Sequence, residues 1–331
     1  MKLATYFDRE PKIGIVDPPD VWDLRGVYLR YLFETEGTPS CADLAARLVP
    51  HDMTLFIRLH HGRLGEIQDA VELVKSLRQA GADVDNLARP LAKTQLLPPV
   101  PNPSKIVCSG SSYVRYAKYL EETGKGMRPE DVKISFLKPP SALIGHGATI
   151  LYPPDSSQWD YEVELSIVIG RTCSDVSEED AASYIFGYSI VNDACVRDIP
   201  KWTGRLDSPR GKAVDTFAPF GPWIVPAPFL GRDPNDLAIR TLVDGEVRQD
   251  DRTSGLLWSV NRIVAYMSRY LRLLPGDVIA TGSTMGNAYD SGKFLKVGQV
   301  VRCEIEAIGA LENTVGVRTW KSKLAPLTPK A

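Results

Sequence analysis

Residues 159–170 constrain the fold most strongly, because acidic and apolar side chains alternate within an otherwise apolar run. In a β-strand, alternate side chains share one face of the sheet. Glu162 and Glu164 are therefore predicted to point one way, and the apolar residues around them the other way. The chain is expected to build a sheet around this strand, with two carboxylates side by side on one face.

Two interpretations of this acidic pair are open. Like charges a few ångströms apart repel unless a cation intervenes, and oxygen ligands suit Mg²⁺, Mn²⁺ or Ca²⁺. Alternatively, the pair belongs to a solvated strand face, which the spacing alone favours. Asp193 shifts the balance toward a metal, because it ends a second apolar strand, over residues 188–192, and supplies a third carboxylate.

The wider pattern predicts an α+β fold that is mostly β. Strands dominate from residue 105 onward without a βαβ rhythm, so the sheet should be mixed or antiparallel. The proline-rich segment 97–103 is predicted to be a linker, because each proline fixes φ and disfavours helix before it. It separates a small N-terminal α+β domain, residues 1–96, from a second domain over residues 104–320 and a tail at 321–331.

Composition excludes several classes of function. The chain has 39 Lys and Arg against 41 Asp and Glu, so no global basic surface for nucleic acid is expected. The sequence contains no uninterrupted apolar stretch of about 18 residues, so no membrane span is predicted. The five cysteines are scattered and odd in number, which favours a reducing environment over a disulfide framework. We expect a soluble, cytoplasmic protein.

Local signals predict several elements. Ser40 and Ser177 resemble helix N-caps, and the helix after Ser177 is expected to run to near residue 187. Apolar periodicity predicts helices over 66–80 and about 260–270. An Asp-Gly pair at 244–245 predicts a type I′ hairpin turn.

Short motifs also follow one another in a specific order between about residues 96 and 316: Leu97-Pro98-Pro99, Phe136 with Lys138, the run from Asp160 to Glu164, Gly187-Tyr188, Asn192-Asp193, Arg197-Asp198, Lys212 with Asp215, Gly221-Pro222-Trp223, Pro275-Gly276-Asp277 and Thr281-Gly282. In this order they resemble the catalytic domain of the fumarylacetoacetate hydrolase superfamily. The resemblance implies a mixed β-sandwich roll behind a small N-terminal domain, assembled as a homodimer.

The resemblance also implies a site. It places a divalent metal, usually Mg²⁺ or Mn²⁺ and sometimes Ca²⁺, on Glu162, Glu164 and Asp193, with Lys212 beside it as a catalytic cation. Its implied substrate-binding positions are Ser111, Tyr113, Lys138, Arg197, Thr281, Gly282 and Ser283. A small 2-oxo or 2,4-dioxo acid is the implied substrate, because its carboxylate and keto oxygens can chelate the metal, which then stabilises an enolate.

The chain departs from the family where hydrolytic members carry a base. The positions of the usual His and Glu, on a helix through about residue 122, hold Tyr116 and Tyr119. A phenol with a pKa near 10 is a poor base at neutral pH, although it can donate a proton or orient water. Glu121, Glu122 and His146 are the other candidates, against the interpretations of exposed helix-end charges and a surface turn. A polar, glycine-rich segment over 123–129 is predicted to be a lid.

Three functional hypotheses follow. Hydrolysis of a carbon–carbon bond has family precedent. Loss of the His/Glu pair instead favours decarboxylation, isomerisation or dehydration, and the two stand level. A third hypothesis is a non-catalytic scaffold that binds metal or ligand. Pro200 and the loop Thr281–Thr284 also differ from the family pattern, so the substrate is expected to differ from a fumarylacetoacetate-type diketone.

Overall fold

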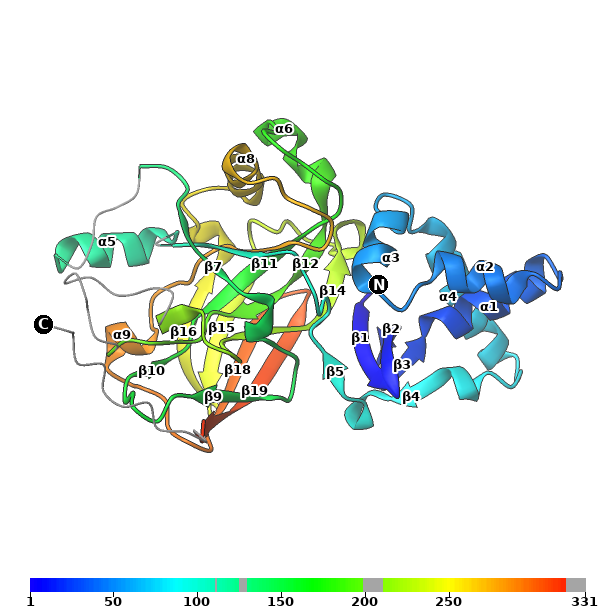
Figure 1. The fold of residues 1–331 in the computed structure, drawn as a ribbon, viewed down its shortest axis with the longest axis horizontal. Coiled ribbons are helices and arrows are strands. Elements are labelled where there is room, and N and C mark those ends of the chain that lie inside the picture. Colours follow the sequence, from blue (N-terminus) through cyan, green and yellow to red (C-terminus); the bar gives the residue numbers. More distant parts are fainter. Residues whose placement is uncertain (111, 125–129, 199–210, 320–331) are drawn as a thin grey trace, which may run out of the picture.

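The computed structural model describes most of the chain (Figure 1), namely residues 1–110, 112–124, 130–198 and 211–319. Ser111, Pro200, most of the predicted lid over 123–129 and the tail at 321–331 lie outside these residues. No helix in the described part is long and apolar enough to cross a membrane.

The N-terminal part is a small sheet with four helices, of which the third lies next to the rest of the chain and the other three lie farther from it (Figure 1). Its elements are β1 Leu3–Asp8, β2 Glu10–Asp17, β3 Asp20–Asp23, α1 Leu24–Thr35, α2 Cys41–Leu48, α3 Met53–His60, α4 Gly65–Gln79, β4 Ala88–Pro90 and β5 Leu96–Leu97. The predicted start of α2 is right, but the predicted cap is wrong: Ser40 has helical φ and ψ angles and its side chain caps nothing.

The main sheet runs through both parts of the chain. Its order is β4-β3-β2-β1-β14-β12-β11-β17-β6-β7, with β5 beside β1 and β8 beside β14. The strands of the second part are β6 Ile106–Ser109, β7 Ile134–Lys138, β8 Leu143–Ile144, β11 Val163–Ile169, β12 Ile185–Asn192, β14 Ala218–Pro226 and β17 Val278–Ala280. Most pairs are antiparallel, whereas β6 with β17 and β8 with β14 are parallel. The prediction of a mixed sheet is confirmed.

A second sheet of five strands faces the main one. Its order is β16-β15-β18-β19-β9, with bounds Glu246–Arg252, Ala238–Val243, Val300–Ile305, Gly309–Val317 and Thr149–Tyr152. A short pair, β10 Trp159–Asp160 and β13 Cys195–Val196, lies at the edge of the roll. The predicted turn joins β15 to β16, with Asp244 and Gly245 both at positive φ, as a type I′ turn requires.

In the described part of the chain, few helices accompany these strands: α5 Val114–Glu122, α6 Glu178–Ala181, α8 Val260–Tyr270 and α9 Ala288–Ser291, with 3-10 turns at Pro140–Ala142, Ala182–Tyr184, Ala227–Phe229 and Thr253–Gly255. Two further 3-10 turns, at Asp85–Leu87 and Leu91–Lys93, belong to the N-terminal part. The bounds predicted for α8 are confirmed. Ser177 caps α6 through a bond from the Asp180 N–H. The length predicted for α6 is wrong, because its chain turns into β12 at Ile185, where apolar side chains become fully buried.

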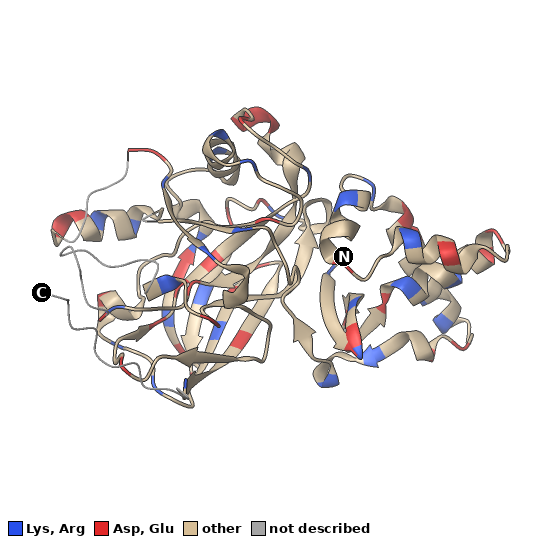
Figure 2. Ribbon diagram, in the orientation of Figure 1, with Lys and Arg blue, Asp and Glu red and all other residues tan. Residues whose placement is uncertain are grey.

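The two faces of β11 belong to two cores. Leu165 and Ile167 pack in the core between the two sheets, against residues such as Ile239 and Val301. Val168 lies on the opposite face, in a core that it shares with the N-terminal helices. Acidic and basic residues are interspersed over both parts of the chain (Figure 2), so neither sign dominates one side. Glu164 shares the Val168 face, and the site is built there.

Candidate functional site

Three carboxylates converge where β11 begins and β12 ends. Val163 pairs with Asn192, and the Asp193 N–H donates to the Glu162 carbonyl at 2.8 Å, so Asp193 is held across from Glu162 and Glu164. One oxygen from each of the three lies within 4.8 Å of the others. Their exposures are 7%, 1% and 2% for Glu162, Glu164 and Asp193. The acidic pair is therefore buried, and the interpretation as a solvated strand face is wrong.

Among the described residues, three cations contact this cluster. The Lys212 ammonium binds Asp193 Oδ2 at 2.5 Å and also contacts Glu162. The Arg197 guanidinium contacts Glu162 and binds Asp160 at 2.7 Å. The Lys138 ammonium lies 2.6 Å from Asp193 Oδ1. The structure thus brings the predicted residues Lys138, Arg197 and Lys212 to the carboxylates.

Lys138 is fully buried rather than an exposed strand end. Its ammonium donates to three carbonyl oxygens, those of Ala194 at 3.2 Å, Lys212 at 2.5 Å and Phe217 at 2.7 Å. Together with Asp193, these acceptors occupy all the N–H donors of the ammonium, so none is left to bind solvent or a ligand. Lys138 therefore anchors the segments that carry Asp193 and Lys212.

The positive charges of Lys138 and Lys212 lie closer to Asp193 than to Glu164. Burial opposes ionisation of Asp193, but the charges of Lys138 and Lys212 outweigh it and lower the pKa of Asp193. Burial, with the charges of Asp193 and Glu162, raises the pKa of Glu164 well above its ordinary value. Among the described residues, no cationic side chain pairs with Glu164, whose Oε2 accepts only the Gly282 N–H, at 2.8 Å. The cluster therefore lacks positive charge beside Glu164.

This donor set fits a hard divalent cation. Carboxylate oxygens are the ligands that Mg²⁺, Mn²⁺ and Ca²⁺ prefer, and a cation between Glu162, Glu164 and Asp193 would relieve the repulsion that raises the pKa of Glu164.

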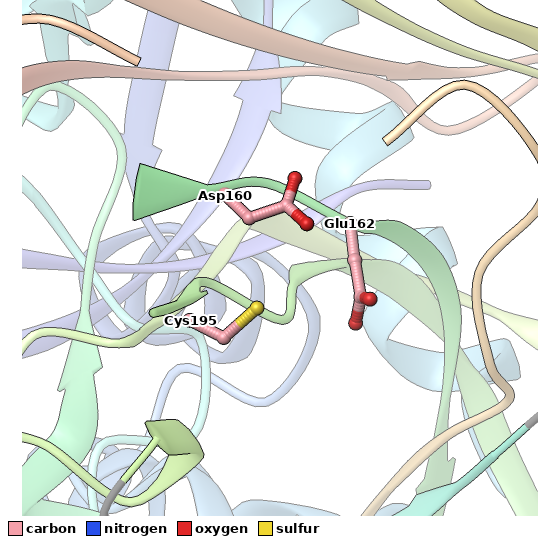
Figure 3. A group of neighbouring side chains, drawn as sticks. All are labelled: Asp160, Glu162 and Cys195. Atoms are coloured by element: carbon pink, nitrogen blue, oxygen red, sulfur yellow. The ribbon is translucent and has the colours of Figure 1, made fainter. Parts of the chain in front are cut away.

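A second group beside it fits a metal poorly. Figure 3 shows Asp160 and Glu162 on one segment and Cys195 on its neighbour. Asp160 already accepts bonds from Arg197 and from the backbone N–H groups of Ala288 and Tyr289 at the start of α9. Burial raises the pKa of the Cys195 thiol to about 12, so it stays a thiol rather than the thiolate that binds metals. Asp160 instead orients Arg197 toward Glu162.

The loop after β17 lies against the cluster. Thr281 donates its hydroxyl to the Leu165 carbonyl at 2.9 Å, and Gly282 donates its N–H to Glu164. Gly282 has φ +97°, and a Cβ there would lie 2.7 Å from the Ser112 hydroxyl oxygen, so only glycine fits. Ser283 follows, 7% exposed. The structure thus places Gly282 in contact with the cluster, Thr281 against β11, and Ser283 next along the same loop.

Helix α5 and its N-cap residue supply the aromatic side of the site. The Tyr113 side chain is buried, and its hydroxyl has no hydrogen-bond partner within the described chain. The Tyr116 and Tyr119 rings stack with centroids 6.3 Å apart. Burial and the nearby Glu162 carboxylate raise the pKa of Tyr116, so this phenol stays protonated at neutral pH.

Three predicted candidates for the base lie elsewhere. Glu121 and Glu122 are exposed on the last turn of α5. His146 accepts the Glu312 N–H of β19 at 3.1 Å and borders a cleft with Leu96 and Trp223. Neither location offers a base next to the three carboxylates.

Two residues of the site escaped prediction as functional residues. Asp160 stood within the acidic motif, but its bonds to α9 come from residues more than a hundred positions away. Gln249 is fully buried on β16, where the pattern Glu-Val-Arg-Gln-Asp gives no sign of an inward-facing polar side chain.

The fold and the acidic cluster define a class: a β-sandwich roll with a buried carboxylate site suited to a divalent cation. Residues 105–316 match the fumarylacetoacetate (FAA) hydrolase C-terminal family, and the chain belongs to this family.

Several relatives span nearly the whole chain. Oxaloacetate tautomerase YisK of Bacillus subtilis is 34% identical over 326 residues, which cover 96% of this chain and all of the relative. Fumarylacetoacetate hydrolase from psychrophilic Exiguobacterium antarcticum has a TM-score of 0.69 and 31% identity, covering 96% of this chain and 100% of its own. Maleylpyruvate hydrolase from Sphingobium sp. SYK-6, in complex with manganese(II) and pyruvate, has a TM-score of 0.67 and 27% identity, over the same shares.

Proposed function

We propose that this protein is a divalent-metal-dependent enzyme that interconverts the keto and enol forms of a small 2-oxo acid, with a dicarboxylic acid such as oxaloacetate as the favoured class. The observation that carries the proposal is the buried carboxylate cluster beside a protonated tyrosine, Tyr116. The full-length similarity to an oxaloacetate tautomerase supports it.

Glu162, Glu164 and Asp193 would hold the cation. When bound, it would supply positive charge against the negative charge that develops on the 2-oxo oxygen during enolisation. Mg²⁺ and Mn²⁺ are the favoured ions, and the relative that is described with manganese(II) and pyruvate supports this choice.

The protein's own residues handle charge and protons. Lys212 orients Glu162 and Asp193 through contacts to both carboxylates, and its charge favours their ionised forms. Tyr116 is a proton donor rather than a base, because its pKa is raised. Tautomerisation moves one proton between carbon and oxygen and consumes no water, so it does not require a His/Glu pair that generates hydroxide.

Carbon–carbon hydrolysis of an acylpyruvate is the second candidate. The similarity to a maleylpyruvate hydrolase over 96% of this chain favours it. Hydrolysis needs an activated water, however. The remaining candidate bases are Glu121 and Glu122, which are exposed, and His146, which binds the Glu312 N–H of β19. Hydrolysis therefore ranks below tautomerisation.

A substrate panel tests the proposal. Oxaloacetate tautomerisation, acylpyruvate hydrolysis and dehydration of 2-keto-3-deoxy acids would be measured after chelation and after return of Mg²⁺ or Mn²⁺. We expect metal-dependent tautomerisation, lost in Glu164→Gln, and a fall of about 100-fold in Tyr116→Phe, which removes the proton donor. Faster acylpyruvate hydrolysis than tautomerisation would favour the second candidate. Absence of turnover with every substrate, despite metal binding, would favour the scaffold.

A further inference from the structure

Gln249 connects the second sheet to the loop beside the carboxylates. It lies on β16, opposite Thr241 on β15, and its side chain is fully buried. Its amide reaches across to two segments of the site: the backbone between Glu162 and Glu164, and the loop that contains Ser283.

The orientation of the Gln249 amide is fixed by its neighbours. The Val163 N–H can only donate, at 3.1 Å, so it requires the amide oxygen, which also accepts the Thr241 hydroxyl at 2.8 Å. The Thr284 carbonyl can only accept, at 2.9 Å, so it requires the amide nitrogen. The second N–H of this nitrogen points at the Ser283 hydroxyl oxygen, 2.9 Å away.

The bond from Gln249 determines whether the Ser283 hydroxyl acts as a donor or an acceptor toward a ligand. A serine hydroxyl has one O–H donor and two lone pairs, and here one lone pair accepts the Gln249 N–H. Gln249 has no free acceptor left for the Ser283 hydrogen, because its oxygen already accepts two bonds. Ser283 keeps 7% exposure and follows Gly282, whose N–H binds Glu164. No bond from the Ser283 hydroxyl to an acceptor is found among the described residues, so its hydrogen is free for a ligand at the loop that contacts Glu164.

We propose that Gln249 is a positioning residue that holds the Ser283 hydroxyl as a hydrogen-bond donor to an acceptor oxygen of the bound acid. The proposal rests on the proposed function, in which a 2-oxo acid binds at Glu162, Glu164 and Asp193. It sharpens the ligand class: the site favours a carboxylate or carbonyl oxygen at this point over a hydroxyl group that must donate.

Oxalate, an unreactive acid with only acceptor oxygens, is the probe. Its affinity for the Mn²⁺-loaded protein would be measured by calorimetry, with the Mn²⁺ affinity measured separately. Ser283→Ala removes the donor, and we expect oxalate to bind about 10-fold or more weakly, whereas Mn²⁺ binds unchanged. Ser283→Thr restores a hydroxyl and with it the hydrogen bond to oxalate, so its oxalate affinity should stay within about 3-fold of wild type. Loss of a hydrogen bond to a charged group would lower the affinity by more than this.

Gln249→Glu tests the positioning role. A carboxylate still accepts from Val163 and Thr241 but cannot donate, so the Ser283 hydrogen turns inward toward it. We expect oxalate affinity to fall, the KM of oxaloacetate to rise more than kcat falls, and no further loss of affinity when Ser283→Ala is added. Gln299→Glu is the matched control, because Gln299 is on an exposed loop where it binds Asp244; it should bind oxalate as wild type does.

The outcomes separate the two proposals. Equal oxalate affinity in wild type and Ser283→Ala overturns this inference, even if Glu164→Gln still abolishes turnover. Additive losses in Gln249→Glu and Ser283→Ala overturn the positioning role. If Gln249→Glu fails to fold, the comparison of Ser283→Ala with Ser283→Thr decides on the donor. Wild-type protein that binds oxalate through Ser283 but turns over no 2-oxo acid contradicts the proposed function alone.

Discussion

The surroundings of Lys138 give it a structural role. Its ammonium lies among Asp193 and three backbone carbonyls, and its side chain is entirely inaccessible. Replacing a buried cation leaves its partners without a donor in a medium where water cannot substitute.

We therefore expect Lys138→Met, a change that nearly preserves volume, to lower the free energy of unfolding by about 3–5 kcal/mol, as for other broken buried ion pairs. Urea unfolding followed by tryptophan fluorescence measures it. Lys293→Met is the control, because Lys293 pairs with Glu246 at the surface and should change stability by less than about 1 kcal/mol. Equal effects of the two variants would contradict the structural role of Lys138.

Asp290 is a carboxylate whose burial costs stability. Its Oδ1 has no hydrogen-bond partner in the described part of the chain, and its Oδ2 accepts only the Gly286 N–H, at 3.1 Å. Burial raises the pKa of Asp290 to about 6. Because the folded state binds this proton more tightly than the unfolded state, stability from this group is present at low pH and is lost as pH rises from about 4 to 6.

Asp290→Asn should consequently stabilise the protein at pH 7–8, by about 1 kcal/mol once screening of the partly exposed side chain is allowed for. The amide oxygen can still accept the Gly286 N–H. Below about pH 4 the aspartic acid is protonated and the difference should vanish. Thermal melts of both proteins across this range measure it, and a variant less stable than wild type at pH 8 would refute the assignment.

At the scale of elements, periodicity predicted β11 and α8 well, because the burial of each is decided by its own sequence. The side chains of 161–167 alternate between two faces as their spacing required, and the three carboxylates met because two neighbouring strands delivered them. Lys138 and Gln249 could not be predicted in this way. The carbonyl partners of Lys138 lie 56 to 79 residues along the chain, and the bond from the Val163 N–H to Gln249 spans 86 residues.

The contact of β12 with β14 offers a test of strand packing. Gly187 lies opposite Pro226, and a Cβ at 187 would lie 2.7 Å from the Pro226 Cα and closer still to the Val225 carbonyl oxygen. Gly187→Ala must separate the strands, and we expect it to cost about 1–3 kcal/mol in unfolding free energy. Gly65→Ala, at a helical glycine with open space around it, should be neutral or slightly stabilising, by up to about 1 kcal/mol. A Gly187→Ala variant as stable as Gly65→Ala would show that the strands can part without cost.

At the scale of the whole molecule, the N-terminal part and the roll share both a sheet and a core. β1 pairs with β14 through Leu3 and Ile224, and the Thr5 hydroxyl donates to the Pro99 carbonyl at 2.6 Å. One apolar cluster contains Phe56 and Ile57 of α3 together with Val168 and Ala280 of the roll. The sequence pattern predicts two domains joined by a proline-rich linker. It could not predict the shared sheet, because pairing between strands far apart in the sequence leaves no signal in local composition.

Because the sheet and the core are continuous, we expect the two parts to unfold together. Phe56→Ala, in the shared core, should lower stability by about 3–5 kcal/mol and should move the unfolding midpoints of both parts equally. Hydrogen exchange read by mass spectrometry, on peptides from α1 and from β11 along a urea series, follows each part separately. Phe33→Ala is the control, because Phe33 is 52% exposed on α1 and should shift neither midpoint appreciably. Earlier loss of protection in α1, while β11 keeps its wild-type midpoint, would show that the N-terminal part unfolds alone and that the shared sheet does not couple it to the roll.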